Sequence, residues 1–382
     1  MEAPERDDTP ALPLAMDEGG KDVSEIRASE EAIMFINGID PIELPKCVFE
    51  DSLVTISEGG RDLGSFYVSV EFARRACRPC MLLHAQSQGA IDNSPCGTTV
   101  TAYLTADLEV LEEEHHEYVK LSDHILDKRC HMVQHDGEMK INKVTTVGNE
   151  VTTESVSYSM SALRGLVTEG SNFLLMRIIA LRKKIPEHMT LISFDQKLQI
   201  ARTTFRGLEE KLMEIDGETV EVFGVERTVH WLDEDPTTWQ CYFLSDGHLA
   251  SRLQVGSPIT MRLLQLPSQK EEGTSTAIVY TNSSIKLALF MFCVYSLFVF
   301  SAYEKIPLVW EEDIQMRSKF LDRKEELKAD HASYLKANPE IRALISDFLQ
   351  FLLLKKPDDV FQFAREYFFP FTSDTNLDTS PH

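Results

Sequence analysis

Cys77 and Cys80 form the pattern in this sequence that is best suited to chemistry. The Cys-Arg-Pro-Cys spacing suits a redox-active dithiol or half of a zinc site. The residues that could complete a zinc site are His84, Cys96, Cys130 and His131. However, a redox motif needs a thioredoxin-like strand and helix around it, and a structural zinc site usually brings a second closely spaced pair. Neither pattern is present, so we expect ordinary buried or edge thiols, with no metal site and no cofactor.

A second polar cluster combines three carboxyl groups with two imidazoles. It comprises Glu112, Glu113, Glu114, His115 and His116. We interpret this cluster as a solvated strand end. The sequence also lacks the GxGxxG, GxxxxGK(S/T), HExxH and GxSxG motifs that would mark nucleotide-binding, metalloprotease or hydrolase sites. The prediction is therefore that the chain is not an enzyme and has no catalytic residue.

The segment that must position these side chains, residues 31–267, alternates apolar and polar residues, which predicts β-strands. Asp-Gly pairs at 136–137, 216–217 and 246–247 lie between such runs and predict hairpins. We expect an α+β protein built on a large antiparallel curved sheet or open β-barrel, with short helices around Ser69 to Arg75 and Asn172 to Leu181. Because a curved sheet can enclose an apolar cavity, a lipid or small-molecule carrier is the competing class of function.

Composition narrows the class of partner. The chain has 382 residues, and 38 basic against 61 acidic residues give a net charge of −23. Nucleic acid is therefore not an expected partner. Seven cysteines, an odd and scattered set, and an N-terminus that starts MEAPERDD without a signal peptide indicate a reducing intracellular setting. We expect residues 1–30 to be a disordered acidic leader and residues 372–382 a disordered tail.

Residues 268–337 are predicted to connect the sheet domain to the C-terminal helices. They include an uncharged stretch of seventeen residues, 287–303, which is shorter than the roughly 20 residues that span a bilayer. The alternatives are membrane contact through 287–303 and burial on an open face or edge of the sheet. From Trp310 to Leu335 the sequence becomes charge-rich and predicts a connecting helix.

Two amphipathic helices are predicted in residues 338–371. Asn338 and Pro339 favour the start of the first helix, whereas Pro357 and Asp359 favour the start of the second. The apolar positions, spaced by three and four residues, are Ile341, Leu344, Ile345, Phe348, Leu349, Leu352, Leu353, Val360, Phe363, Ala364, Tyr367 and Phe368. A two-helix unit of this size is too small to bury such a stripe alone, so it must meet a second copy or another domain.

This spacing, with the motif Pro357, Asp359, Val360, Phe363 and Ala364, resembles the RII-alpha type dimerisation and docking domain. The resemblance implies that two hairpins pair into a four-helix bundle. It also implies an apolar groove for an amphipathic helix of an anchoring or axonemal protein. The alternative is that the hairpin simply caps the domain before it.

The strand-rich body, the PLVWEED entry into a charged helix and the C-terminal helices together resemble the CATIP family of ciliogenesis-associated proteins. This resemblance implies a non-enzymatic adaptor in primary cilium formation and actin polymerisation, bound to a tetratricopeptide-repeat protein. It implies a location in cytoplasm, cytoskeleton and cilium, and also in the nucleus and at the plasma-membrane periphery. By analogy with other docking-domain proteins, an axonemal component of radial-spoke type is an alternative role.

Overall fold

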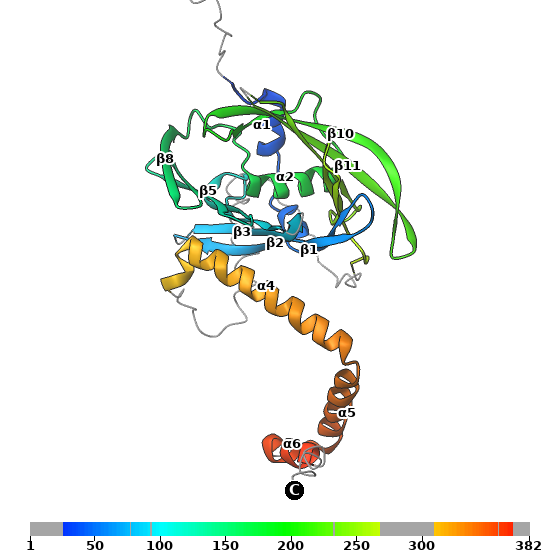
Figure 1. Cartoon of the computed structure of the whole chain (residues 1–382). Helices are drawn as coiled ribbons and strands as arrows, with labels where there is room; N and C mark the ends of the chain where they lie inside the picture. Colours follow the sequence, from blue (N-terminus) through cyan, green and yellow to red (C-terminus); the bar gives the residue numbers. More distant parts are fainter. Residues whose placement is uncertain are drawn as a thin grey trace, which may run out of the picture. The chain divides into compact units, whose positions relative to one another are not determined.

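The computed structural model describes residues 26–76, 78–91, 94–231, 234–267, 309–357 and 359–369. Its main feature is one sheet of fourteen strands in the order β8-β7-β6-β5-β4-β3-β2-β1-β14-β13-β12-β11-β10-β9 (Figure 1). In chain order the strands are β1 (Glu50–Ser57), β2 (Asp62–Arg75), β3 (Arg78–Ile91), β4 (Ser94–Leu104), β5 (Val110–Lys120), β6 (Ile125–His135), β7 (Glu138–Val147), β8 (Glu150–Ser159), β9 (Thr190–Phe194), β10 (Ile200–Ile215), β11 (Glu218–His230), β12 (Thr237–Phe243), β13 (Leu249–Gln254) and β14 (Ile259–Arg262). Every neighbouring pair is antiparallel, which confirms the predicted large antiparallel sheet.

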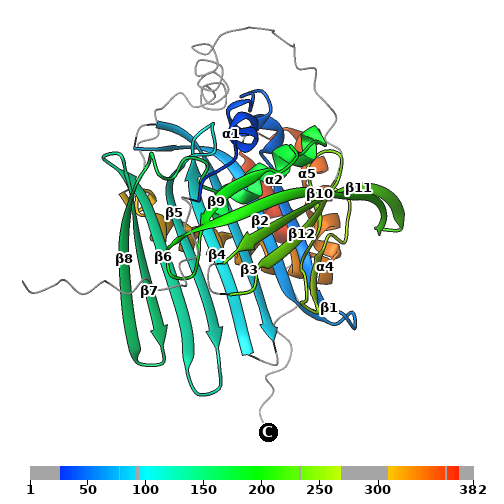
Figure 2. The same ribbon diagram turned by 90° about the horizontal axis from the view of Figure 1, so that it is seen from above.

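The sheet curves until its two edge strands, β8 and β9, approach each other (Figure 2). The Tyr158 hydroxyl donates a hydrogen bond to the carbonyl oxygen of Leu198 at 2.9 Å, and the Tyr158 ring stacks on Phe194 with 5.5 Å between centroids. These contacts involve side chains, and β8 and β9 are not paired in the strand order. The curved sheet therefore stays open along this line.

The Asp-Gly turns occur where the sequence predicts them. Asp136 and Gly137 have φ of 52° and 79°, and Asp216 and Gly217 have φ of 56° and 77°. Positive φ at both central residues is the condition for the tight hairpin turn that matches strand twist. The third pair, at 246–247, lies in a longer loop that is closed by a hydrogen bond from the Leu244 N–H to the His248 carbonyl oxygen at 2.8 Å.

The helix predicted around Ser69 to Arg75 is wrong, because these residues belong to β2. Phe66, Val68 and Val70 alternate with more exposed residues and are at most 3% exposed. This period of two outweighs local helix propensity because it places every second side chain in the core. By contrast, the helix predicted from Asn172 to Leu181 is confirmed as α2 (Glu169–Arg182).

Helix α2 lies on the concave face of the sheet, between its two halves (Figure 1). All its residues from 170 to 180 are buried, so the helix is enclosed around its circumference, with Ser171, Asn172 and Arg177 as buried polar residues among apolar ones. Thr168 and Ser171 form a capping box at its N-terminus. Gly170 allows close packing there, because a Cβ atom at this position would lie 2.5 Å from the Cβ of Ala102 and 2.7 Å from Oε2 of Glu113.

A buried ion pair joins α2 to the first strand. Arg177 donates a hydrogen bond to Asp51 at 2.7 Å and further ones to the carbonyl oxygens of Cys47 and Phe49. Nδ1 of His248 lies 2.6 Å from the second carboxylate oxygen of Asp51. The Arg177 and Asp51 side chains are at most 2% exposed, so each charge depends on the other for stabilisation.

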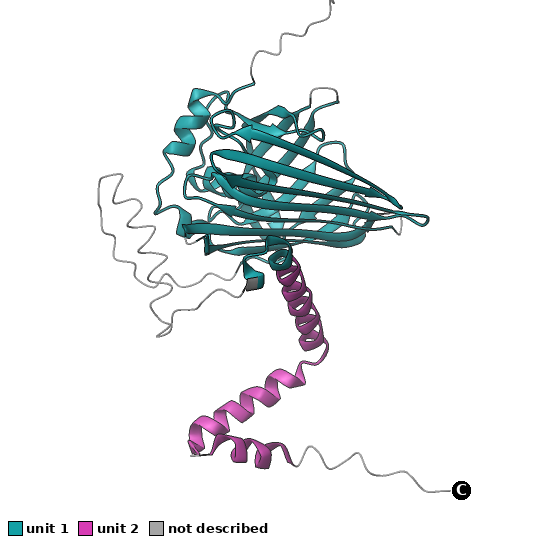
Figure 3. Ribbon diagram, turned by 90° about the vertical axis from the view of Figure 1, so that its left-hand side faces the viewer, with its two compact units in different colours: residues 1–318 teal, residues 319–382 magenta. Residues whose placement is uncertain are grey.

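The chain divides into two compact units, residues 1–318 and 319–382 (Figure 3). Outside the sheet and α2, the first unit contains α1 (Glu30–Asn37) and the short 3-10 helices η1 (Leu44–Cys47) and η2 (Val309–Glu311). Helix α4 (Ile314–Ala337), the predicted charged helix, begins in the first unit, and the second unit also contains α5 (Glu340–Lys355) and α6 (Val360–Phe368). The apolar stretch 287–303, and residues 1–25 and 372–382, lie outside the described residues. Within the described part of the chain, no helix combines the length and apolarity needed to cross a bilayer.

Candidate functional site

Of the Cys77–Cys80 pair, for which the sequence favours ordinary thiols over a redox or zinc site, the structure describes one member. Cys77 lies outside the described residues, and Cys80 is fully buried on β3. Burial raises the pKa of the Cys80 thiol to about 12, so it stays protonated and is a poor nucleophile at neutral pH.

The residues that could complete a zinc site with this pair lie apart. Cys96 pairs with Gly89, nine residues along β3 from Cys80, which corresponds to roughly 30 Å. Nδ1 of His84 is 2.9 Å from the Thr101 hydroxyl. Within the described ranges, no group of three His, Cys, Asp or Glu side chains is arranged to hold a metal ion.

The acidic cluster at 112–116 is not a solvated strand end, and that interpretation is wrong. These residues lie on β5, inside the sheet between β4 and β6, and side chains alternate between its two faces. Glu112, Glu113 and Glu114 are 7%, 0% and 3% exposed. On one face, Glu112 accepts a hydrogen bond from Nε of Arg75 at 2.7 Å and lies 3.0 Å from Nε2 of His131. Burial raises the pKa of Glu114 on that face.

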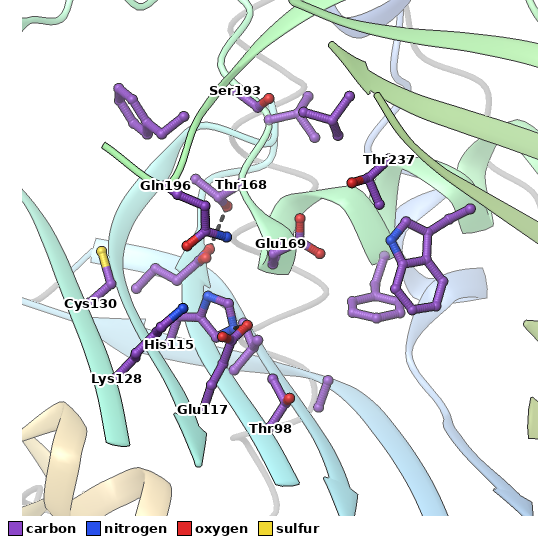
Figure 4. Close-up of a pocket in the computed structure, with 18 of the residues that line it drawn as sticks. Thr98, His115, Glu117, Lys128, Cys130, Thr168, Glu169, Ser193, Gln196 and Thr237 are labelled. Atoms are coloured by element: carbon purple, nitrogen blue, oxygen red, sulfur yellow. Dashed lines mark hydrogen bonds and ion pairs between the residues drawn. The ribbon is translucent and has the colours of Figure 1, made fainter. Parts of the chain in front are cut away.

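The other face of β5 lines a cavity of about 420 Å³ on the concave side of the sheet (Figure 4). Glu113, His115 and Glu117 come from this strand, and Lys128 and Cys130 come from β6. The N-terminus of α2 contributes Thr168, Phe173 and Glu169, and the wall formed by the second half of the sheet contributes Ser193, Arg227, Trp239 and Arg252. Side chains from strands at both ends of the chain thus meet in one polar chamber.

Glu113 holds the first turn of α2. Its Oε2 accepts hydrogen bonds from the Thr168 hydroxyl and, at 3.2 Å, from the N–H of Gly170. Its Oε1 has no hydrogen-bond partner. Burial disfavours the charged form and raises the pKa of Glu113 to about 7, in spite of the hydrogen bond from Thr168. This carboxyl group therefore changes its charge near neutral pH.

His115 and Glu117 form an ion pair beside Glu113, with 3.2 Å between Nε2 and Oε1. Burial opposes the charged imidazole, but the close contact with the negatively charged Glu117 outweighs burial and raises the pKa of His115. The contact with His115 correspondingly lowers the pKa of Glu117. Both groups thus remain charged over a wider pH range than they would alone.

Glu169 lies between two arginines. It accepts a hydrogen bond from Nη1 of Arg227 at 2.7 Å. Burial would raise its pKa, but the charges of Arg227 and Arg252 outweigh this effect and lower the pKa of Glu169 to about 2. One carboxylate therefore faces two guanidinium groups.

Arg252 is surrounded by aromatic rings. The centre of its guanidinium lies 4.1 Å from the ring centroid of Trp239, 5.0 Å from that of Phe173 and 5.4 Å from that of Phe66. Its Nε is buried and makes no hydrogen bond to any residue that the structure describes. These cation–π contacts stabilise the charge in part, although burial lowers the pKa of Arg252.

The sequence did not predict this cavity. The charged residues that line it lie on β5, β6, β7, α2, β11 and β13, among other places, and share no short motif, and only Glu113 and His115 belonged to a recognised cluster of charged residues. The one available signal was a charged residue at an inward-facing position of an alternating strand, as at Arg227 and Arg252. The charged lining also differs from the apolar cavity expected of a lipid carrier.

The predicted docking residues lie on α5 and α6, which pack against each other within the second unit. The Phe348 ring centroid is 6.1 Å from that of Phe363, 5.2 Å from that of Tyr367 and 5.0 Å from that of Phe368. Asp359 caps α6 by accepting a hydrogen bond from the N–H of Gln362 at 2.9 Å. The aromatic positions of the second helix thus meet the middle of the first.

The apolar stripe of α5 divides into two sets. Ile341, Leu344, Phe348 and Leu352 are half-buried, whereas Ile345, Leu349 and Leu353 are 45%, 48% and 69% exposed. On α6, Phe363, Ala364, Tyr367 and Phe368 are half-buried, and Val360 is 46% exposed. No residue of α5 or α6 is fully buried, so the interface role of these residues stays a prediction.

The fold and the cavity define a class: a protein whose open, curved antiparallel sheet wraps a buried helix and a polar chamber, followed by a small apolar helix pair. The chain belongs to the family of ciliogenesis-associated TTC17-interacting proteins, because the model of that family's N-terminal domain matches residues 31–258. This range covers most of the sheet and every cavity-lining residue from Phe66 to Gln254, but not Met261.

Relatives with that name extend over nearly the whole chain. The protein from Danio rerio is 45% identical over 92% of this chain and 95% of its own length. Those from Xenopus laevis and Homo sapiens are 43% and 34% identical, over 92% and 90% of this chain and 88% and 84% of their own lengths. A solved β-barrel-like protein of unknown function from Brucella abortus has 11% identity and a TM-score of 0.35 over 56% of this chain and 93% of its own, a likeness too weak to support further conclusions.

Proposed function

We propose that this protein is a non-enzymatic adaptor in primary cilium formation that binds a tetratricopeptide-repeat protein of the TTC17 kind through its sheet domain. The observation that carries the proposal is the family membership, since the relatives are named for ciliogenesis and for interaction with TTC17. The family match on the sheet domain favours that domain as the partner-binding part. An effect on actin polymerisation, through the bound partner, belongs to the same proposal.

The non-enzymatic part of the proposal is supported by how the cavity's titratable groups are engaged. Glu113, whose pKa near 7 would suit a general acid or base, uses its carboxyl oxygen to hold Thr168 and Gly170. Glu169 is held by Arg227, and Glu117 by His115. These groups stabilise each other and the start of α2, which is a structural role.

We propose that the C-terminal helices α5 and α6 determine where the protein concentrates in the cell. The exposed edge of α5, formed by Ile345, Leu349 and Leu353, would be covered by α5 of a second copy. A homodimer would then offer a groove for an amphipathic helix of an anchoring or axonemal protein. We propose that the protein acts in the cytoplasm and cytoskeleton and at the cilium, with nuclear and plasma-membrane pools as further predictions.

Two measurements in ciliated cells test the proposal: capture of the tetratricopeptide-repeat partner tests the role of the sheet domain, and localisation tests the role of the C-terminal helices. The full chain and a chain that ends at Asn338 should both capture the tetratricopeptide-repeat partner, while only the full chain should concentrate at cilia or actin-rich protrusions. A fragment of residues 306–382 should localise but not bind the partner. If the truncated chain still concentrates at cilia or actin-rich protrusions and the fragment is diffuse, the sheet domain determines the localisation and the helices serve assembly only.

A further inference from the structure

The cavity contains a cationic group whose charge the protein balances incompletely. Among the lining side chains, Arg129 lies 3.2 Å from Asp127, Lys143 lies 3.5 Å from Glu154, and Arg227 is bound to Glu169. Arg252 has no carboxylate within ion-pair distance in the part of the chain that the structure describes. Its neighbour on β12 is the Cys241 thiol, which is only a weak acceptor.

Apart from Oε1 of Glu113, the carboxyl groups of the cavity are, in contrast, already engaged. Glu169 accepts from Arg227, Glu117 pairs with His115, and Asp195 accepts from the backbone N–H groups of Lys197 and Gln199 at 2.8 and 2.7 Å. Lys128 lies directly across from Glu117 on the neighbouring strand. In a chain with a net charge of −23, the two guanidinium groups of Arg252 and Arg227 therefore share the single carboxylate of Glu169, and a second negative charge beside them is missing from the described residues.

Two further features of the cavity indicate what kind of molecule could bind beside Arg252. The rings of Trp239, Phe173 and Phe66 form an apolar surround within 5.4 Å of the guanidinium. On β9, Ser193 is 4% exposed and faces the same cavity (Figure 4), and its Oγ has no hydrogen-bond partner within the described ranges. Buried polar atoms of native proteins are normally hydrogen-bonded, so the Ser193 hydroxyl and Nε of Arg252, both without a hydrogen bond among the described residues, indicate a missing partner in this cavity.

We propose that the cavity binds a small organic monocarboxylate with an apolar body, whose carboxylate pairs with Arg252 while its body packs on Trp239, Phe173 and Phe66. The carboxylate would complete a second ion pair beside Glu169–Arg227. A volume of about 420 Å³ lies in the range of small-molecule sites. A dianionic phosphate is disfavoured, because Glu169 and Glu117 line the same chamber and would repel the second charge. This role is separate from the adaptor function.

Tryptophan fluorescence of the full chain gives a direct test, because two of its three tryptophans, Trp231 and Trp239, line the cavity. The probes are 4-phenylbutyrate, octanoate and indole-3-acetate, with 4-phenylbutyramide and inorganic phosphate as comparisons. Isothermal titration calorimetry measures the same set independently. We expect saturable binding of at least one carboxylate, with the amide about tenfold weaker or worse, since a charge-assisted hydrogen bond is lost. Saturation by none of the three acids, or equal affinity for acid and amide, would overturn the proposal.

The matched variants are Arg252→Gln, Arg252→Lys and Arg262→Gln, the last on an exposed residue of the adjacent strand β14. Arg252→Gln should weaken carboxylate binding at least tenfold, Arg252→Lys should retain part of it, and Arg262→Gln should leave it unchanged. Ser193→Ala, a small change, should weaken binding a few-fold and serves if Arg252→Gln does not fold. Unchanged carboxylate affinity in a folded Arg252→Gln protein, or in Ser193→Ala where Arg252→Gln does not fold, would refute this assignment.

Discussion

Glu113→Gln should flatten the pH dependence of stability. In the folded protein the pKa of Glu113 is raised from 4.5 to about 7, so the folded state holds a proton that the unfolded chain releases. The wild-type protein therefore loses stability as pH rises from about 4.5 through 7, because ionising the buried carboxyl is costly. Glutamine resembles the protonated group and removes this loss.

The size of this stability change follows from the pKa of Glu113 in the folded and in the unfolded state. At pH 5.5 the raised pKa costs the wild type about 1 kcal/mol relative to a neutral side chain, and at pH 8.5 it costs about 3 kcal/mol, because each pKa unit corresponds to about 1.4 kcal/mol. Between these pH values the variant should thus gain about 2 kcal/mol on the wild type. Both values lie above the isoelectric point of about 4.9, so the chain remains negatively charged throughout.

Urea unfolding followed by tryptophan fluorescence at both pH values measures the effect, since Trp231 and Trp239 report on the cavity. Glu150→Gln, on an exposed residue of the edge strand β8, is the control and should leave the pH dependence unchanged. The reasoning is refuted if Glu113→Gln and the wild type differ by the same free energy at pH 5.5 and 8.5.

Three further substitutions test the fold and the dimer. Arg177→Met leaves the carboxylate of Asp51 buried without its arginine and should lower the free energy of unfolding by about 3–5 kcal/mol; an unchanged urea midpoint would contradict this. Gly170→Ala brings a methyl group against β4 and Glu113 and should cost about 1–3 kcal/mol, measured in the same way, and a neutral or stabilising result would show that α2 can shift. Leu349→Asp should convert a dimer to a monomer in light scattering, while Gln350→Asp on the same helix should not; a dimer that survives Leu349→Asp places the interface elsewhere.

Much of the sheet could be predicted because its signals are local. Asp-Gly pairs at 136–137 and 216–217 specify tight turns by backbone geometry alone, and the alternation of Phe66, Val68 and Val70 marks a half-buried strand. The helix expected around Ser69 to Arg75 was wrong because the pairing of β2 with β3 extends through those residues as far as Arg75, and the pairing with β1 reaches Ser69. Pairing with distant strands is a tertiary effect that a short window does not contain.

The polar cavity could not be predicted from such local signals. Glu113 was recognised as part of a cluster, but its burial depends on α2, some 57 residues away, and that of Arg252 depends on aromatic rings from β2, α2 and β12. In an alternating strand, a charged residue is normally expected to face solvent. Whether its face of the strand is in fact buried inside the curved sheet depends on the curvature, which the sequence of the strand does not show.

By itself the sequence determined the antiparallel sheet, helix α2, the C-terminal helices and the family, because periodicity, turn residues and caps act over a few residues of chain. The tertiary structure decided which face of β5 is enclosed, that Glu169 lies between Arg227 and Arg252, and that Ser193 and Arg252 face one cavity. The physical reason is that burial and charge pairing depend on distance in space. Strands seven places apart in the sheet, such as β6 and β13, line the same cavity only after the whole sheet has curved.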